Sequence, residues 1–71
     1  MTSAEKETGM VKVFDHFKGY GFITREKGKD VFFFYDDIAT NDTHIFPGDY
    51  VSFYLKQEPK GPRAYDVKKI K

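Results

Sequence analysis

KGYGFI at residues 18–23 and VFFFY at residues 31–35 are the two segments that decide the fold of this chain. Successive side chains of an extended strand point to opposite faces. Tyr20 and Phe22 therefore share one face of the first segment, and Phe32 and Phe34 share one face of the second. If the two segments pair as neighbouring strands, four rings gather on one surface. A chain this small cannot bury rings on both faces of one sheet, so one face is predicted to stay open to a ligand.

Composition indicates one small domain without covalent reinforcement. The chain has 71 residues, which leaves no room for a second domain. It has no cysteine, so disulfides and thiolate metal sites are excluded, and this agrees with a cytoplasmic location. No apolar run approaches the roughly 20 residues of a membrane span, and the polar N-terminus lacks the apolar stretch of a signal peptide. We therefore expect a soluble, cytoplasmic protein with no membrane partner.

The charge balance is close to neutral. Lys and Arg number 12 against 11 Asp and Glu, which gives a net charge of +1. A protein that holds duplex nucleic acid by electrostatics is usually strongly basic. If nucleic acid is the partner, base stacking must supply much of the affinity.

The chain divides into a polar start and a run of short strands. Residues 1–8 are polar without periodicity and are predicted to be a flexible tail, so that the domain covers residues 9–71. Residues 36–48 are predicted to be mostly loop. The predicted strands cover residues 10–14, 20–24, 31–35, 50–56 and 63–70. Five short strands in so small a domain favour an all-β antiparallel barrel over a sandwich.

The strand pattern also separates a core from the four rings. An alternative is that these rings are themselves the core, but other apolar residues suffice to fill a small barrel. The predicted core residues are Val11, Ile23, Val31, Phe33, Val51, Phe53, Leu55 and Val67.

Taken together, the motifs resemble those of the cold-shock domain. The matching segments are GMVK at residues 9–12 followed by Phe14, KGYGFI at 18–23, DVFFFY at 30–35 followed by Ile38, and Gly48, VSF at 51–53, KGPRA at 60–64 and Val67. The resemblance covers residues 9–70. It implies a five-stranded antiparallel Greek-key OB-type barrel that binds single-stranded RNA or DNA and acts as an ATP-independent nucleic-acid chaperone. We expect a monomer, with dimerisation through an edge strand left open.

Three positions depart from the family pattern. Val13 stands where the family has tryptophan, Asp15 where it has asparagine, and Phe34 where it has histidine. The loop at 36–48 is also about one residue short, and His44 or Phe46 is predicted to supply its stacking ring. Each departure removes something that a base or a phosphate would use. Val13, Asp15 and Phe34 slightly favour the rival hypothesis, an OB-type interaction module whose aromatic face meets a protein or small ligand, while single-strand binding stays the main expectation.

The candidate nucleic-acid-binding residues combine the rings with nearby cations. Tyr35 is included by resemblance alone, because strict alternation puts it on the opposite face from Phe34. Tyr65 is a further candidate beside Arg63. The set is Lys12, Phe14, Lys18, Tyr20, Phe22, Phe32, Phe34, Tyr35, His44, Lys60 and Arg63.

Sequence patterns for catalysis, metals and cofactors are weak. Asp36 and Asp37 are adjacent, which is more typical of a solvated turn or a cap for a short helical turn than of an acid–base pair. His16 and His44 lack metal-ligand spacing. The glycines around Tyr20 and Gly28 fit neither a dinucleotide fingerprint nor a P-loop. We expect no enzyme activity, no metal and no cofactor.

Overall fold

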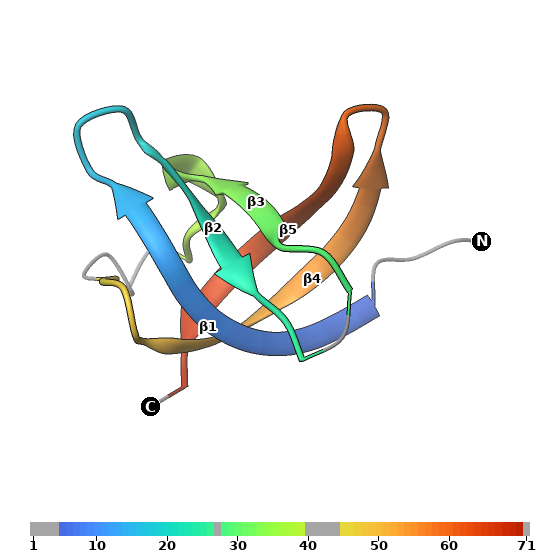
Figure 1. The fold of residues 1–71 in the computed structure, drawn as a ribbon, viewed down its shortest axis with the longest axis horizontal. Helices are drawn as coiled ribbons and strands as arrows, with labels where there is room; N and C mark the ends of the chain where they lie inside the picture. Colours follow the sequence, from blue (N-terminus) through green and yellow to red (C-terminus); the bar gives the residue numbers. More distant parts are fainter. Residues whose placement is uncertain (1–4, 27, 40–44, 71) are drawn as a thin grey trace.

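The computed structural model describes residues 5–26, 28–39 and 45–70. Its five strands close into a barrel in the order β1-β2-β3-β5-β4 (Figure 1). The predicted all-β, five-stranded barrel is therefore confirmed. The elements are β1 (Glu5–Asp15), β2 (Tyr20–Thr24), β3 (Val31–Phe34), the short 3-10 helix η1 (Tyr35–Asp37), β4 (Tyr50–Glu58) and β5 (Gly61–Lys69).

Neighbouring strands pair antiparallel except where β3 meets β5. That contact is parallel, and its register places Phe32 beside Arg63. The predicted antiparallel barrel thus contains one parallel strand contact. The parallel contact matters for function because it brings the start of β5 against the strand that carries two of the four rings.

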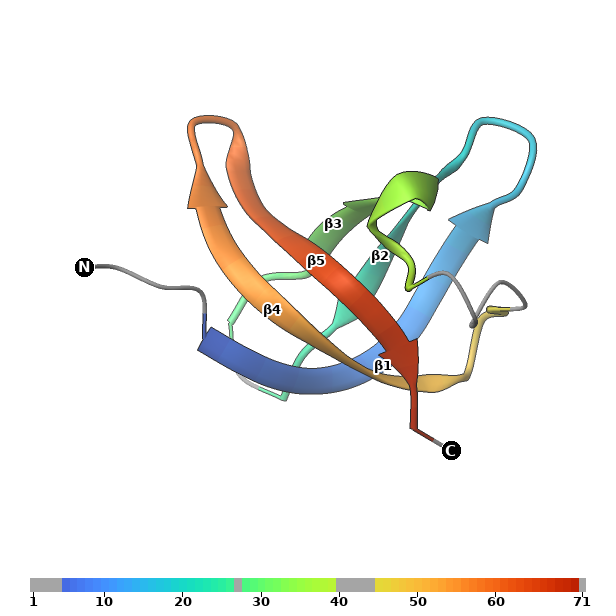
Figure 2. The ribbon, with the colours of Figure 1, turned by 180° about the vertical axis from the view of Figure 1, so that it is seen from behind.

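β1 is long and strongly curved, and it takes part in both halves of the barrel (Figures 1 and 2). Its first half pairs with β4 and its second half with β2. Gly9 lies just before Met10, the residue of β1 that pairs with both β2 and β4. A Cβ atom there would lie 2.5 Å from the carbonyl oxygen of Thr24 and 2.7 Å from Cγ2 of Ile23, so only glycine fits.

The predicted tail is wrong for residues 5–8. β1 begins at Glu5, and these residues pair with β4. The ammonium of Lys6 also lies 5.9 Å from the ring centroid of Tyr54. A strand held by main-chain pairing and cross-strand contacts needs no alternating apolar pattern, so the sequence of residues 5–8 does not indicate a strand. Residues 1–4 lie outside the described part of the chain.

The core follows the predicted strand faces closely. Seven of the eight predicted core residues are buried, and Leu55 is partly buried against them. Four further residues complete the core, namely Phe14, Ile38, Ile45 and Ala64. Ile38 and Ile45 lie within the predicted loop at 36–48 and attach it to the barrel, since Ile38 bridges to Val67 and Ile45 is fully buried.

A bulge in β1 decides which of its side chains face the core. The register with β2 shifts between Val11 and Val13. Val11 is buried, Lys12 and Val13 are both exposed, and Phe14 turns inward with 8% of its surface exposed. The extra residue of a bulge reverses the alternation beyond it. Phe14 therefore belongs to the core and not to the outer face.

Candidate nucleic-acid interface

Four rings of β2 and β3 form one continuous outward surface, which we call the aromatic face. Tyr20 pairs with Phe34, and Phe22 pairs with Phe32. The ring centroids of Phe22 and Phe32 are 5.6 Å apart, those of Tyr20 and Phe32 5.7 Å, and those of Phe32 and Phe34 4.7 Å. Such spacings are typical of favourable edge and offset ring contacts. The predicted gathering of these four rings is present in the structure.

The aromatic face lies outside the core. Ile23, Val31 and Phe33, which alternate with the rings along the same strands, are fully buried. Phe34 is 41% exposed and the other three rings are half-buried. The alternative in which the four rings fill the barrel is therefore wrong.

Arg63 extends the aromatic face from β5. Its guanidinium lies 4.6 Å from the ring centroid of Phe34 and 4.7 Å from that of Tyr65. Its Nε donates to Oδ2 of Asp37 at 3.0 Å, and its Nη2 donates to Oδ1 at 3.1 Å. This two-point ion pair fixes the guanidinium plane beside the rings.

Asp37 is buried and holds the guanidinium of Arg63 in place. Besides binding Arg63, its Oδ2 accepts a hydrogen bond from the backbone N–H of Phe34 at 2.9 Å, which caps η1. Of the two interpretations that the sequence offered for Asp36 and Asp37, a solvated turn or a cap for a short helical turn, the cap is observed for Asp37. Its pairing with Arg63 was not predicted, because residues 26 positions apart give no pattern that a single sequence reveals.

Hydrogen bonds shift the pKa values of two side chains near the aromatic face. The hydrogen bond to Asp37 raises the pKa of Arg63 above its ordinary value, against an opposing effect of burial. The hydroxyl of Tyr65 donates to Oε2 of Glu58 at 2.8 Å, and this bond raises the pKa of Tyr65. Arg63 stays charged and Tyr65 stays neutral through the physiological pH range.

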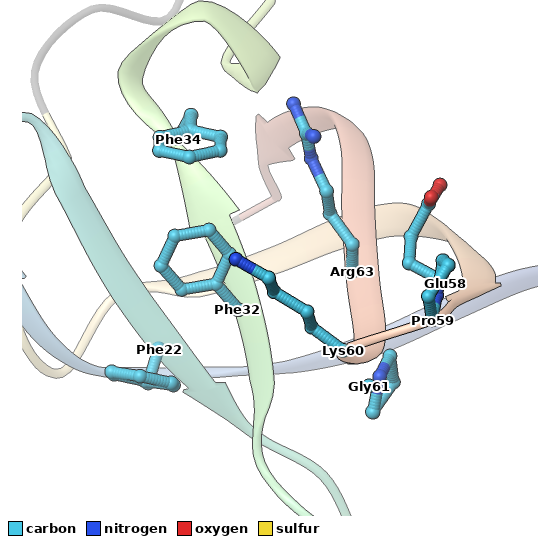
Figure 3. Close-up of a pocket in the computed structure, with 9 residues that line it drawn as sticks. Phe22, Phe32, Phe34, Glu58, Pro59, Lys60, Gly61 and Arg63 are labelled. Carbon is cyan, nitrogen blue, oxygen red and sulfur yellow. The ribbon is translucent and has the colours of Figure 1, made fainter.

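A groove runs between the aromatic face and the β4–β5 hairpin. Figure 3 shows three phenylalanine rings on one side and the side chains of Glu58, Lys60 and Arg63 on the other. The groove joins an apolar wall to a polar wall that carries both signs of charge. The lining residues are Phe22, Phe32, Phe34, Glu58, Pro59, Lys60, Gly61, Pro62 and Arg63.

The predicted cationic residues differ in their ion pairing and in where they are exposed. Lys12 forms an exposed ion pair with Asp30, with Nζ and Oδ2 3.0 Å apart. Lys18 is exposed in the β1–β2 turn, and Lys60 is exposed in the β4–β5 turn. Lys60 lines the groove, whereas a phosphate that binds Lys12 would have to compete with the carboxylate of Asp30.

The remaining predicted site residues are more scattered. Phe14, a candidate binding residue, is 8% exposed and packs in the core against Phe33, with ring centroids 5.3 Å apart, so the structure does not bring it to the aromatic face. Tyr35 is 55% exposed at the start of η1, and its N–H donates to the carbonyl oxygen of Gly19 at 2.8 Å. His44 lies outside the described residues. Phe46, the other candidate from that loop, is exposed and contacts His16 at a centroid distance of 5.4 Å.

Comparison with known proteins agrees with this geometry. Residues 7–70 match the model of the 'Cold-shock' DNA-binding domain. The chain belongs to the cold-shock domain family. A retron Se72 cold shock-like protein from Salmonella heidelberg is 47% identical over 66 residues, which cover 90% of this chain and 98% of that protein. A cold shock-like protein of Thermotoga maritima is 41% identical over 63 residues, covering 87% of this chain and 96% of that protein.

A solved structure shares the fold of this cold-shock domain. The structure of "drosophila Unr CSD456" matches 97% of this chain with a TM-score of 0.80 and 23% sequence identity. This chain spans 28% of the Unr chain. At that identity the likeness supports the fold alone.

Within the cold-shock domain, two of the three departures have visible consequences. Val13 pairs with Phe22 and is 46% exposed, so it continues the aromatic face without adding a ring. Asp15 accepts hydrogen bonds at Oδ1 from the backbone N–H groups of Phe17 at 3.0 Å and Lys18 at 2.9 Å. The carboxylate therefore holds the β1–β2 turn that leads into the aromatic face.

The described part of the chain contains no candidate metal centre. In residues 5–26, 28–39 and 45–70, no group of three or more His, Cys, Asp or Glu side chains is placed to hold a metal ion. The described ranges also contain no helix that is long and apolar enough to cross a membrane.

Proposed function

We propose that this cold-shock domain binds single-stranded RNA and DNA through the aromatic face. The observation that carries the proposal is the set of four mutually contacting rings that stand outside a complete core. Exposed rings are costly unless a ligand covers them, and the bases of an unpaired strand present flat apolar faces that match them.

Stacking alone gives a useful affinity. Each base stacked on an aromatic side chain contributes about 1–3 kcal/mol. Three or four stacked bases then give binding in the micromolar range or tighter, after the cost of ordering the strand is subtracted. Duplexes are poor ligands for such a surface, because paired and stacked bases hide the faces that the rings would contact.

The proposed cellular activity is that of a nucleic-acid chaperone without enzyme activity. A protein that binds only unpaired strands shifts a hairpin towards its open form by mass action. This shift requires no ATP. We expect the domain to act in the cytoplasm as a monomer.

The direct test is a titration of a fluorescein-labelled pyrimidine oligonucleotide of about seven nucleotides, followed by anisotropy at low salt. We expect saturable binding in the micromolar range or tighter, and much weaker binding of a duplex of the same length. Tyr50→Ala is the matched control, since Tyr50 is an exposed ring on β4 that does not belong to the aromatic face. It should leave the affinity unchanged.

Absence of saturable binding at tens of micromolar protein would overturn the proposal and favour the interaction-module rival. The chaperone step is tested separately with a fluorophore–quencher RNA hairpin. The protein should open it without ATP in proportion to occupancy. A hairpin that stays closed while the single strand binds would limit the function to binding.

A further inference from the structure

Arg63 uses only one of the two hydrogen-bonding edges of its guanidinium. The edge formed by Nε and Nη2 is bonded to the two carboxylate oxygens of Asp37. The second edge, formed by Nη1 and the other N–H of Nη2, points away from Asp37 because the guanidinium is planar. Among the residues that the structure describes, no hydrogen bond is made by Nη1.

The second edge is held in a fixed position. The guanidinium contacts the rings of Phe34 and Tyr65, and Asp37 is itself buried and hydrogen-bonded to the backbone of β3. Little conformational entropy remains to be lost when a ligand binds to a side chain held in this way. Arg63 also lines the groove, and its guanidinium lies 4.6 Å from the ring centroid of Phe34, so the side chain stands beside the surface on which bases would stack (Figure 3).

Two carboxylates close to Arg63 decide what kind of acceptor suits it. Asp37 is bonded to it directly, and Glu58 lies near enough to contribute to its raised pKa. Glu58 also lines the same wall of the groove. A phosphate approaching the open edge would meet both negative charges, whereas the uncharged acceptors of a base would not.

We propose that Arg63 reads a guanine base stacked beside Phe34, an inference that rests on the proposed binding of single strands by the aromatic face. A guanidinium edge donates two parallel hydrogen bonds, and guanine offers the acceptors O6 and N7 side by side. Adenine pairs an acceptor with a donor on that edge, and thymine has one acceptor there. Cytosine also offers two adjacent acceptors, N3 and O2, on its pairing edge, but its single ring stacks on Phe34 over a smaller area than the double ring of guanine.

The test compares oligonucleotides that differ at one base. The probes are a fluorescein-labelled thymine oligonucleotide of about seven nucleotides and three versions whose central base is guanine, adenine or 7-deazaguanine. The guanine version should bind about tenfold more tightly than the all-thymine one, since one two-point base contact typically gives about five- to 150-fold discrimination. 7-Deazaguanine, which lacks the N7 acceptor, should lose most of the gain.

A pair of arginine variants separates the guanine contact from general charge. Arg63→Lys keeps the charge but cannot donate two parallel hydrogen bonds, so it should bind all four probes about equally. Arg25→Lys is the matched control, because Arg25 also bonds a carboxylate, that of Glu7 at 3.3 Å, but lies outside the groove lining. It should keep the preference for guanine. Circular dichroism checks that both variants are folded.

The outcomes distinguish this inference from the function on which it rests. Equal binding of the thymine and guanine probes by the unmodified protein overturns the role of Arg63 and leaves single-strand binding intact. A guanine preference that survives in 7-deazaguanine or in Arg63→Lys also overturns it. If the affinity of every probe falls equally in Arg63→Lys, Arg63 contacts phosphate instead. Failure of all probes to bind the unmodified protein contradicts the proposed function itself.

Discussion

Phe22 and Phe32 stand directly opposite each other on β2 and β3, with their ring centroids 5.6 Å apart, and neither belongs to the buried core. This pair is the centre of the aromatic face, because Phe32 also contacts Tyr20 and Phe34. Replacing both rings with alanine therefore tests whether the pair serves binding or the packing of the fold.

The double variant Phe22→Ala with Phe32→Ala should therefore lose binding but keep its fold. The loss of two stacked bases, at about 1 kcal/mol or more each, weakens oligonucleotide affinity by at least about thirtyfold. Anisotropy titration measures the affinity, and circular dichroism with thermal melting measures the fold. A variant that no longer melts cooperatively would indicate that the two rings are needed for the fold.

The aromatic face could be predicted from sequence because it depends only on local alternation. Residues 20–24 and 31–34 are regular strands, so the parity of each position fixes its face. Phe14 shows where this reasoning fails. It shares its parity with Lys12, but the bulge between Val11 and Val13 reverses the faces.

The polar wall of the groove could not be predicted in the same way. The ion pair of Arg63 with Asp37 depends on the parallel contact between β3 and β5, which joins segments far apart in sequence. The strand at residues 5–8 was missed for a related reason. Its stability comes from pairing with β4, and its own sequence carries no apolar pattern.

Gly21→Ala should be strongly destabilising although the backbone there is ordinary. A Cβ at this position would lie 2.9 Å from Cζ of Phe33 and 3.0 Å from Cα of Phe14, and still closer to the carbonyl oxygen of Val13. Two of these are backbone atoms of β1, so β1 and β2 would have to separate. We expect a loss of about 2–3 kcal/mol in the free energy of unfolding, measured in urea.

Gly48→Ala is the matched control for a purely conformational cost. Gly48 has a φ of 97°, and a Cβ atom added there would have no neighbouring atom within 4 Å, so the new methyl group meets no steric conflict. Its cost should be about 1 kcal/mol, from the left-handed backbone alone. If Gly21→Ala costs no more than Gly48→Ala, β1 and β2 can accommodate a methyl group between them.

Asp15 should tolerate asparagine but not alanine. Asparagine keeps an oxygen that can accept from the N–H groups of Phe17 and Lys18, while alanine leaves both donors without that acceptor. Asp15→Ala is expected to lose about 1 kcal/mol of stability in urea unfolding, and Asp15→Asn much less. Asp15 pairs with Tyr20, so removing its charge should also tighten oligonucleotide binding. Equal stability of the two variants would contradict the capping role.

Tyr65 should ionise at higher pH than an ordinary tyrosine. Its hydrogen bond to Glu58 favours the protonated phenol and raises its pKa. The stabilisation is therefore fully present below the unfolded pKa of about 10 and is lost as the pH rises through the folded value. An absorbance titration at alkaline pH should lose its highest-pH component in Tyr65→Phe. An unchanged titration at the high-pH end would show that the bond does not persist in solution.

Salt should weaken oligonucleotide binding only slightly if stacking dominates. The net charge is +1, and Lys12 is already paired with Asp30, so few phosphates are neutralised. With two or three phosphate contacts, the slope of log affinity against log salt should be about −1.4 to −2. Lys60→Gln should make the slope shallower by about 0.7 if Lys60 meets one phosphate. A slope steeper than about −5 would mean that phosphate contacts, and not the rings, supply most of the affinity.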